Sequence, residues 1–250
     1  MEILLGLGIA IAISLTGVGA GVITAPVLIL FFHVPPAQAV GTALAYSVAV
    51  KFLVVPMQLL RRQVNFRVLA YMLAGGLPGV LIGSGLLSLL NRQGRQGLLY
   101  AVLGSTILIM ASLNLYKLAV KRSPEAVKDR TAWLPALMLP VGAEVGFSSA
   151  GAGALGSLAL LSMTPLTATE VVGTDLFFGL AVSLVGGGFQ ITAGNYEAAI
   201  LAKLIAGGIA GALIGTSIAA AAPRRTLRAV LSLWLITLGI QLCWTGVTHW

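Results

Sequence analysis

The chain has 250 residues, of which 58% are hydrophobic and only 9% are charged, and its mean hydropathy is +1.00. Because a water-soluble domain carries about 25% charged residues, this composition excludes a soluble globular protein and indicates an integral membrane protein. Two histidines and a single cysteine exclude an internal disulfide and a histidine or cysteine metal cluster. The net charge of +8 comes mostly from basic residues in short gaps between apolar runs, which is typical of loops at the lipid surface.

Eight apolar segments follow one another along the chain, each long enough for about one membrane span. In the first half they cover residues 3–32, 37–60, 68–90 and 97–116, and in the second half residues 132–163, 167–191, 198–222 and 229–248. A charged linker at residues 117–130 separates the two groups. We therefore predict an all-α integral membrane protein with a first repeat at 1–118, a charged linker at 119–131 and a second repeat at 132–250.

The two halves are related by a constant offset of 132 residues. Residues 74–84 match residues 206–216 at seven of eleven positions, and Val40-Gly41-Thr42 falls on Val172-Gly173-Thr174. At the same offset Gln58 falls on Gln190 and Arg92 on Arg224. Paired repeats in a membrane protein usually indicate a transporter whose substrate is held between the repeats near the midplane.

The first segment of each half is interrupted by a glycine-rich turn. Thr16-Gly17-Val18-Gly19-Ala20-Gly21 interrupts the first half, and Gly146 to Gly153, which includes Ser148, Ser149 and Gly151, interrupts the second. Each glycine costs a helix about 1 kcal/mol relative to alanine, so these runs favour a break, and a break at membrane depth is tolerated only where it lines a cavity or ligand. The alternative is that these glycines only permit close helix packing, the role we assign to Gly75, Gly79, Gly83 and to Gly207, Gly211, Gly215.

The basic residues distinguish two topologies. If all eight segments cross the membrane, eight Lys and Arg residues lie on one side and five on the other. If each broken segment enters and returns on one side, the distribution becomes eleven against two, which is a clear positive-inside signal. We favour the second topology, because it also makes the repeats inverted. It places the N-terminus, residues 190–197 and Trp250 outside, and Arg61, the linker and Arg224 in the cytoplasm.

The motifs resemble those of the sulfite exporter TauE/SafE family of small membrane permeases, and the resemblance covers nearly the whole chain. It rests on Gly17-Val18-Gly19-Ala20-Gly21 with Pro26, on Val40-Gly41-Thr42 and on Arg62-Gln63-Val64-Asn65-Phe66. In the second half it rests on Gly151-Ala152-Gly153, Gly173-Thr174 and Gly194-Asn195-Tyr196-Glu197. The resemblance implies a secondary transporter of small sulfur-containing anions such as sulfite or sulfonates.

The polar residues of these segments agree with an anionic substrate in outline. Helix N-termini after each break would present N–H groups and positive dipole ends to an anion. Hydroxyl donors could come from Thr16, Thr42, Ser148, Ser149 and Thr174, although such hydroxyls also commonly bond the backbone of their own helix. Gln58 and Gln190 could contact substrate or cap helix ends. Glu144, near the second break, could carry a proton or simply reach water.

Lys51 and Asp175 are the charges placed deepest in the apolar segments. An ionisable residue at bilayer depth indicates a functional site by default. In inverted repeats the two lie at similar depth, so we expect them to face each other, with Lys51 attracting the anion and Asp175 compensating Lys51 when the site is empty. A purely structural ion pair, or a Lys51 that reaches the membrane surface, remains the alternative.

Other function classes fit less well. The chain has no G-x-x-x-x-G-K-[ST] phosphate loop, no His-Glu-x-x-His motif and no paired catalytic aspartates, so neither an ATP-driven pump nor an intramembrane enzyme is expected. A channel for a small anion or neutral solute is the alternative, because broken helices also build filters. We expect no cofactor and no nucleic-acid partner. A small anion and the lipid bilayer are the expected partners, and coupling protons and a homodimer are left open.

Overall fold

The computed structural model describes every residue except 1, 17–19, 120–128, 154, 219–223 and 249–250. The described residues form α-helices and one short 3-10 helix, with no strand among them. The first half contains α1 (Glu2–Thr16), α2 (Ala20–Phe32), α3 (Pro36–Leu60), α4 (Phe66–Arg92) and α5 (Gln96–Ala119). The second contains η1 (Thr131–Trp133), α6 (Leu134–Ser148), α7 (Leu155–Met163), α8 (Ala168–Thr192), α9 (Ala198–Ile218) and α10 (Arg224–Thr248). The predicted all-helical class is confirmed.

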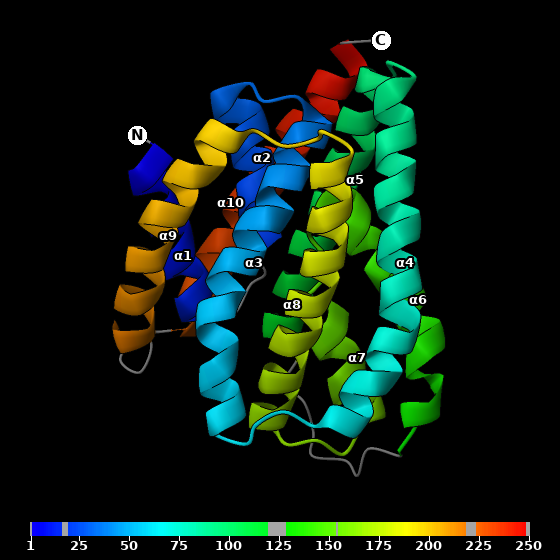
Figure 1. Ribbon diagram of the computed structural model, residues 1–250, viewed down its shortest axis with the longest axis vertical. Coiled ribbons are helices and arrows are strands. Elements are labelled where there is room, and N and C mark those ends of the chain that lie inside the picture. Colours follow the sequence, from blue (N-terminus) through cyan, green and yellow to red (C-terminus); the bar gives the residue numbers. More distant parts are fainter. Residues whose placement is uncertain (1, 17–19, 120–128, 154, 219–223, 249–250) are drawn as a thin grey trace.

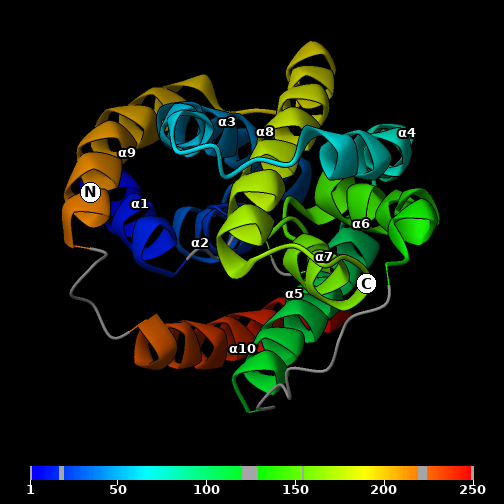
Figure 2. The same cartoon turned by 90° about the horizontal axis from the view of Figure 1, so that it is seen from below.

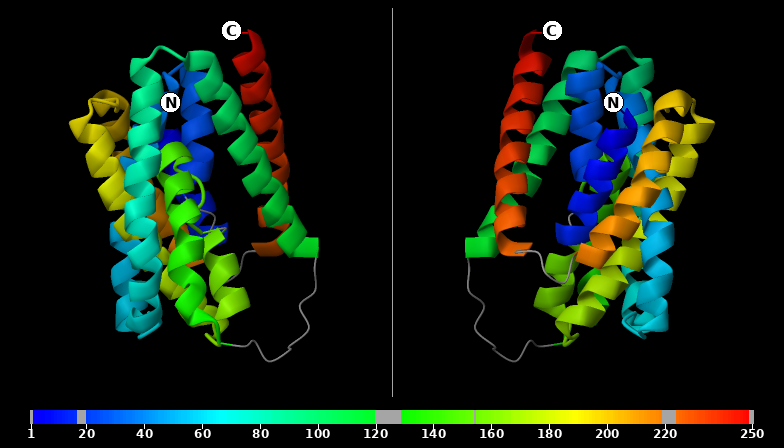
Figure 3. Two further views of the ribbon diagram at one scale, coloured as in Figure 1. Left: turned by 90° about the vertical axis from the view of Figure 1, so that its right-hand side faces the viewer. Right: turned by 90° about the vertical axis from the view of Figure 1, so that its left-hand side faces the viewer.

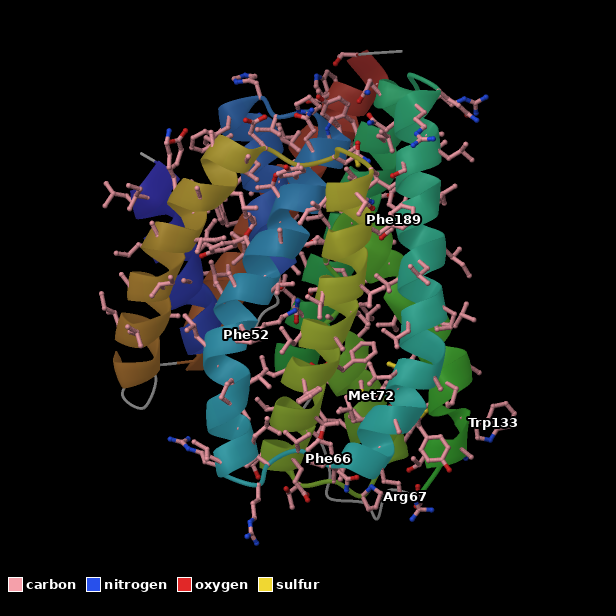
Figure 4. The ribbon with its side chains drawn as sticks, in the orientation of Figure 1. Phe52, Phe66, Arg67, Met72, Trp133 and Phe189 are labelled. Carbon is pink, nitrogen blue, oxygen red and sulfur yellow. The ribbon has the colours of Figure 1, made fainter. Side chains whose placement is uncertain are left out.

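Six of the described helices, α3, α4, α5, α8, α9 and α10, are long and apolar enough to cross a membrane. Helices satisfy their own backbone groups, which is the condition for spanning a bilayer. Large apolar side chains such as Phe52 and Leu184 are mostly exposed, as lipid-facing residues are. Figure 4 shows Trp133 projecting away from the helices at the end of the bundle where Arg67 also lies.

The helix ends follow from local residues. Asn65 caps α4, because its side-chain oxygen accepts a hydrogen bond of 3.1 Å from the Val68 N–H. Thr167 and Glu170 form a capping box at the start of α8. The exposed Glu170 carboxylate therefore stabilises the N-terminus of this helix. Gly194, with φ +74°, follows the end of α8 and allows the chain to turn into α9.

The short helices α1, α2, α6 and α7 do not continue through the bundle. In Figures 1 and 3, α1 runs inward from the end where the N-terminus lies and α2 returns to that end. From the opposite end, α6 runs inward and α7 runs back. A hydrogen bond of 2.8 Å from the Arg130 N–H to the Met163 carbonyl joins the start of this second segment to its finish. The chain therefore has the geometry of the re-entrant topology, while the division into two repeats stays a prediction.

Helices from the two halves pack against each other. Helix α1 packs on α9, α6 on α4, α3 on α8 and α5 on α10. Figure 2 shows α3 and α8 on one edge of the bundle, α5 and α10 on the opposite edge, and the short helices α2 and α7 between these pairs. This arrangement places one helix of each broken segment, α2 and α7, in the middle of the molecule.

The glycines spaced four apart make the close packing that we predicted for them. On α4, a Cβ at Gly75, Gly79 or Gly83 would overlap the α6 carbonyls of Pro135, Leu139 and Ala143 respectively. On α9, a Cβ at Gly207 or Gly211 would overlap the α1 carbonyls of Ile3 and Leu7. The carbonyls that face the α9 glycines and those that face the α4 glycines are also 132 residues apart, so the same packing contact occurs in both halves. Glycine is needed here because only a missing side chain lets the backbones approach this closely.

Candidate functional site

The start of α2 meets the α6–α7 connection inside the bundle. Gly21, the second residue of α2, lies against the carbonyl and hydroxyl oxygens of Ser149 from the α6–α7 connection. A Cβ at Gly21 would overlap both oxygens, so this contact requires glycine. The start of one half-helix is therefore in direct contact with the interruption of the other broken segment.

Ser149 combines an uncommon backbone conformation with an unsatisfied hydroxyl. It ends α6 in the left-handed region, at φ 64° and ψ 3°, and its N–H donates to the Val145 carbonyl at 2.8 Å. The residue is only 6% exposed, and its hydroxyl has no hydrogen-bond partner among the described residues. Leaving a buried hydroxyl unpaired costs about 1–3 kcal/mol. Because this hydroxyl faces the first turn of α2, whose N–H groups lack partners within the helix, the position is suited to an anion.

The interruption between α6 and α7 is held by its own side chains. The Ser148 hydroxyl accepts a hydrogen bond of 3.1 Å from the Ala150 N–H and donates one of 2.6 Å to the Glu144 carboxyl. Gly151 is buried against Glu144, and Gly153 has a φ of +94° that favours glycine. The predicted break is confirmed in this half, where α6 ends at Ser148 and α7 begins at Leu155.

Lys51 lies where α3 crosses α8. Its ammonium donates to the Gly179 carbonyl at 3.0 Å and to the Ser183 hydroxyl at 3.1 Å, and the side chain is buried, with only 6% of the residue exposed. A Cβ at Gly179 would lie 2.9 Å from the Lys51 nitrogen and 3.4 Å from the Ala152 Cβ. The Lys51 charge therefore lies beside the α6–α7 break, and Lys51 does not extend to the membrane surface.

Asp175 lies one turn before Gly179 on α8 and reaches the start of α7. Its carboxylate accepts a hydrogen bond of 2.5 Å from the Ser157 hydroxyl and lies against Gly156, the second residue of α7. The residue is 5% exposed, and its charge interacts favourably with the Lys51 ammonium. A carboxylate at a helix N-terminus is stabilised by the helix dipole. The first turns of the two half-helices therefore have different polar neighbours. The first turn of α7 contacts the Asp175 carboxylate, whereas the first turn of α2 faces the Ser149 hydroxyl.

Thr42 and Thr174 hold helix connections. The Thr42 hydroxyl accepts a hydrogen bond of 2.9 Å from the Glu197 N–H, and the Thr174 hydroxyl accepts one of 3.0 Å from the Asn65 N–H. Both threonines are fully buried, and these two bonds obey the offset of 132 residues. The bonds fix the chain just before α9 and α4. Neither expectation included this role, and contact of these hydroxyls with substrate stays a prediction.

The two glutamines occupy different surroundings. Fully buried Gln190 accepts from Asn195 at 2.8 Å and from Ser88 at 3.2 Å, and donates to the Ser84 carbonyl at 3.2 Å. It joins α4, α8 and the α8–α9 connection. Gln58, near the end of α3, is partly exposed, and its buried side-chain oxygen has no partner among the described residues. Neither glutamine forms a described contact with the breaks.

The remaining predicted residues belong to the first break. Gly17 and Gly19 lie outside the described residues, and so does the side chain of Thr16, the last residue of α1. Of this turn, only Gly21 can be placed against the second break.

Sequence reasoning missed the partners of the two buried charges. Ser183 lies 132 residues after Lys51, and Gly179 lies 132 residues after Ser47, whose hydroxyl accepts from Ser183 at 3.4 Å. The offset that relates the glycines therefore also relates Lys51 to its hydroxyl partner, and it could have identified Ser183. By contrast, the Ser157 contact with Asp175 depends on the α7–α8 connection, and no sequence pattern indicates it.

Comparison with known proteins identifies the family. A sequence model of the family described as "Sulfite exporter TauE/SafE" matches residues 2–242. The chain is also 25% identical over 249 residues to the "Probable membrane transporter protein YjnA" of Bacillus subtilis (strain 168), covering 96% of this chain and 98% of that protein. No solved structure matches the chain significantly. Together with the six membrane-spanning helices, these findings establish a multi-pass membrane protein of a transporter family. The resemblance seen in the sequence motifs is confirmed, and the chain belongs to the TauE/SafE sulfite exporter family.

Proposed function

We propose that the protein is a secondary transporter of small sulfur-containing anions, such as sulfite or a sulfonate, and that the anion binds where the start of α2 meets the α6–α7 break. The observation that carries the proposal is the unpartnered, buried Ser149 hydroxyl facing the first turn of α2. An anion there would receive hydrogen bonds from backbone N–H groups and from this hydroxyl. The name of the family supports sulfite-like chemistry.

Lys51 supplies the positive charge in this proposal. Its ammonium packs against Gly179 of α8, as does Ala152 of the α6–α7 break, and it donates two hydrogen bonds to α8. Since an ammonium has three donors, one remains to attract the anion. Asp175 compensates the charge of Lys51 when no anion is bound, so the empty site does not leave a buried lysine without a counter-charge.

Burial favours a carrier over an open channel. Both Ser149 and Lys51 are almost fully buried, as expected for a site that the protein encloses rather than for the wall of an open pore. A carrier must move between such states, and the two re-entrant segments enter from opposite ends and meet at the site. We further propose that the end carrying Arg61 and Arg62 faces the cytoplasm, by the positive-inside rule.

Flux in proteoliposomes tests the function. We expect uptake of radiolabelled methanesulfonate or sulfite to saturate with concentration and to be stimulated by unlabelled anion on the other side. Thiosulfate, sulfate and short carboxylates complete the panel and define the anion class. Rapid flux that does not saturate and shows no counterflow would indicate a channel instead. Absence of flux for every anion in the panel would refute the proposal.

A further inference from the structure

Glu144 is a carboxyl group in the break that the proposed anion site does not use. It lies on α6, one turn before the helix ends, and is partly buried. The Ser148 hydroxyl donates to it at 2.6 Å, and the Thr106 hydroxyl of α5 is its second polar partner. Gly151 packs against its side chain. Glu144 therefore links the α6–α7 break to a helix of the α5–α10 pair.

The two hydroxyls beside Glu144 can serve both protonation states of its carboxyl. The Thr106 hydroxyl can rotate to donate either to the Leu103 carbonyl at 2.9 Å or to Glu144. An ionised Glu144 can therefore accept hydrogen bonds from both Ser148 and Thr106. A neutral Glu144 can accept from Ser148 and donate its own proton to Thr106.

Among the described residues, no positively charged side chain lies close enough to Glu144 to stabilise its ionised form. Among the described residues, no Lys or Arg side chain lies within ion-pair distance of it. Its polar partners there are the two hydroxyls of Ser148 and Thr106, and no described charged side chain acts on it. The helices that pack against α6 carry these ionisable side chains within the described ranges: Arg67, Tyr71 and Arg92 on α4, Tyr100 and Tyr116 on α5, and Glu170 and Asp175 on α8.

We propose that Glu144 is the proton-binding residue that couples anion transport to a proton gradient. This inference rests on the proposed function, because it concerns the same break. An ionised Glu144 would repel an anion bound at Ser149, five residues along the chain, whereas a neutral Glu144 would not. Anion binding and protonation therefore favour each other, and proton and anion cross together. For a monovalent anion this symport moves no net charge.

Methanesulfonate flux in proteoliposomes loaded with a pH-sensitive dye tests the coupling. A sulfonate stays ionised across the working pH range, so a lumenal pH change reports protons carried by the protein. We expect methanesulfonate uptake to acidify the lumen, and an inside-alkaline gradient of one pH unit to drive about tenfold accumulation. In Glu144→Gln, which is permanently neutral, acidification and accumulation should be lost while counterflow of labelled methanesulfonate persists.

Two further variants make the test specific. Glu170→Gln, in the exposed capping box of α8, should retain both coupling and counterflow. Thr106→Val removes a hydrogen bond that favours the ionised carboxylate, so half-maximal gradient-driven uptake should move to less acid pH, even if Glu144→Gln proves unstable. The proposal is overturned if Glu144→Gln still accumulates methanesulfonate, or if the wild type shows counterflow without proton movement. A wild type without any counterflow would instead refute the proposed function.

Discussion

Replacing Gly21 with alanine should strongly reduce anion transport. The added methyl group would overlap the carbonyl and hydroxyl oxygens of Ser149, so α2 and the α6–α7 break must separate. Insertion of a methyl into a packed core typically costs about 1–3 kcal/mol, and here the strain falls on the proposed anion site itself. We expect the initial rate of methanesulfonate counterflow to fall by at least about tenfold.

Gly188→Ala provides the matched control for this prediction. Gly188 lies on α8, and a Cβ there meets no atom within 4 Å. The control variant should transport at the wild-type rate. Both proteins should elute as single species in detergent, since the bundle is held by many other contacts. Wild-type flux in Gly21→Ala would show that the close approach of the two breaks is not needed for transport.

Neutralising Lys51 should raise the apparent KM for the anion sharply. Lys51→Met retains the length of the side chain but removes the ammonium that lies beside the break. A hydrogen bond to a charged group contributes about 1.5–3 kcal/mol, which corresponds to roughly a tenfold to hundredfold rise in KM. The variant also leaves the Asp175 carboxylate without its compensating charge, so some loss of stability is expected.

The double variant separates the two effects. Lys51→Met with Asp175→Leu should recover folding, because it removes the uncompensated carboxylate, but it should not recover transport. Lys203→Met is the control for removal of a lysine: Lys203 is about half exposed and pairs with Glu2 at 2.8 Å on the surface, where such pairs contribute little. Normal transport by the double variant would exclude the pair from substrate binding.

The sequence predicted the helices, the breaks and the packing glycines because each has a local signal. Apolar length marks the spans, the glycine run marks the second break, and the four-residue spacing of Gly75, Gly79 and Gly83 marks a close helix contact. Because the same features recur 132 residues later, the second half supported each interpretation made for the first. The distribution of the basic residues favoured segments that turn back within the bundle, as α1–α2 and α6–α7 do in Figure 1, while their sides of the membrane stay a prediction.

The pairing of the helices could not be predicted in this way. A helix that is apolar on all sides gives no sign of which neighbour it faces, so the packing of α1 on α9 and of α6 on α4 has no signal in either segment alone. For the same reason, Ser157 could not be assigned to Asp175. Thr42 and Thr174 were considered as ligands because their hydroxyls are polar in an apolar segment, but the connections that they hold are specified by the tertiary structure.

Substrate protection of a cysteine introduced at position 149 tests whether the anion binds where the start of α2 meets the α6–α7 break. Ser149→Cys would be made in a Cys243→Ala background, which removes the natural thiol of the chain. We expect methanesulfonate to slow labelling of this variant by a small thiol reagent, with half-maximal protection at the apparent KM for transport. The same anion should not slow labelling of Gly188→Cys in the same background. Labelling of the Ser149→Cys variant that is unaffected by a saturating concentration of transported anion would contradict the account.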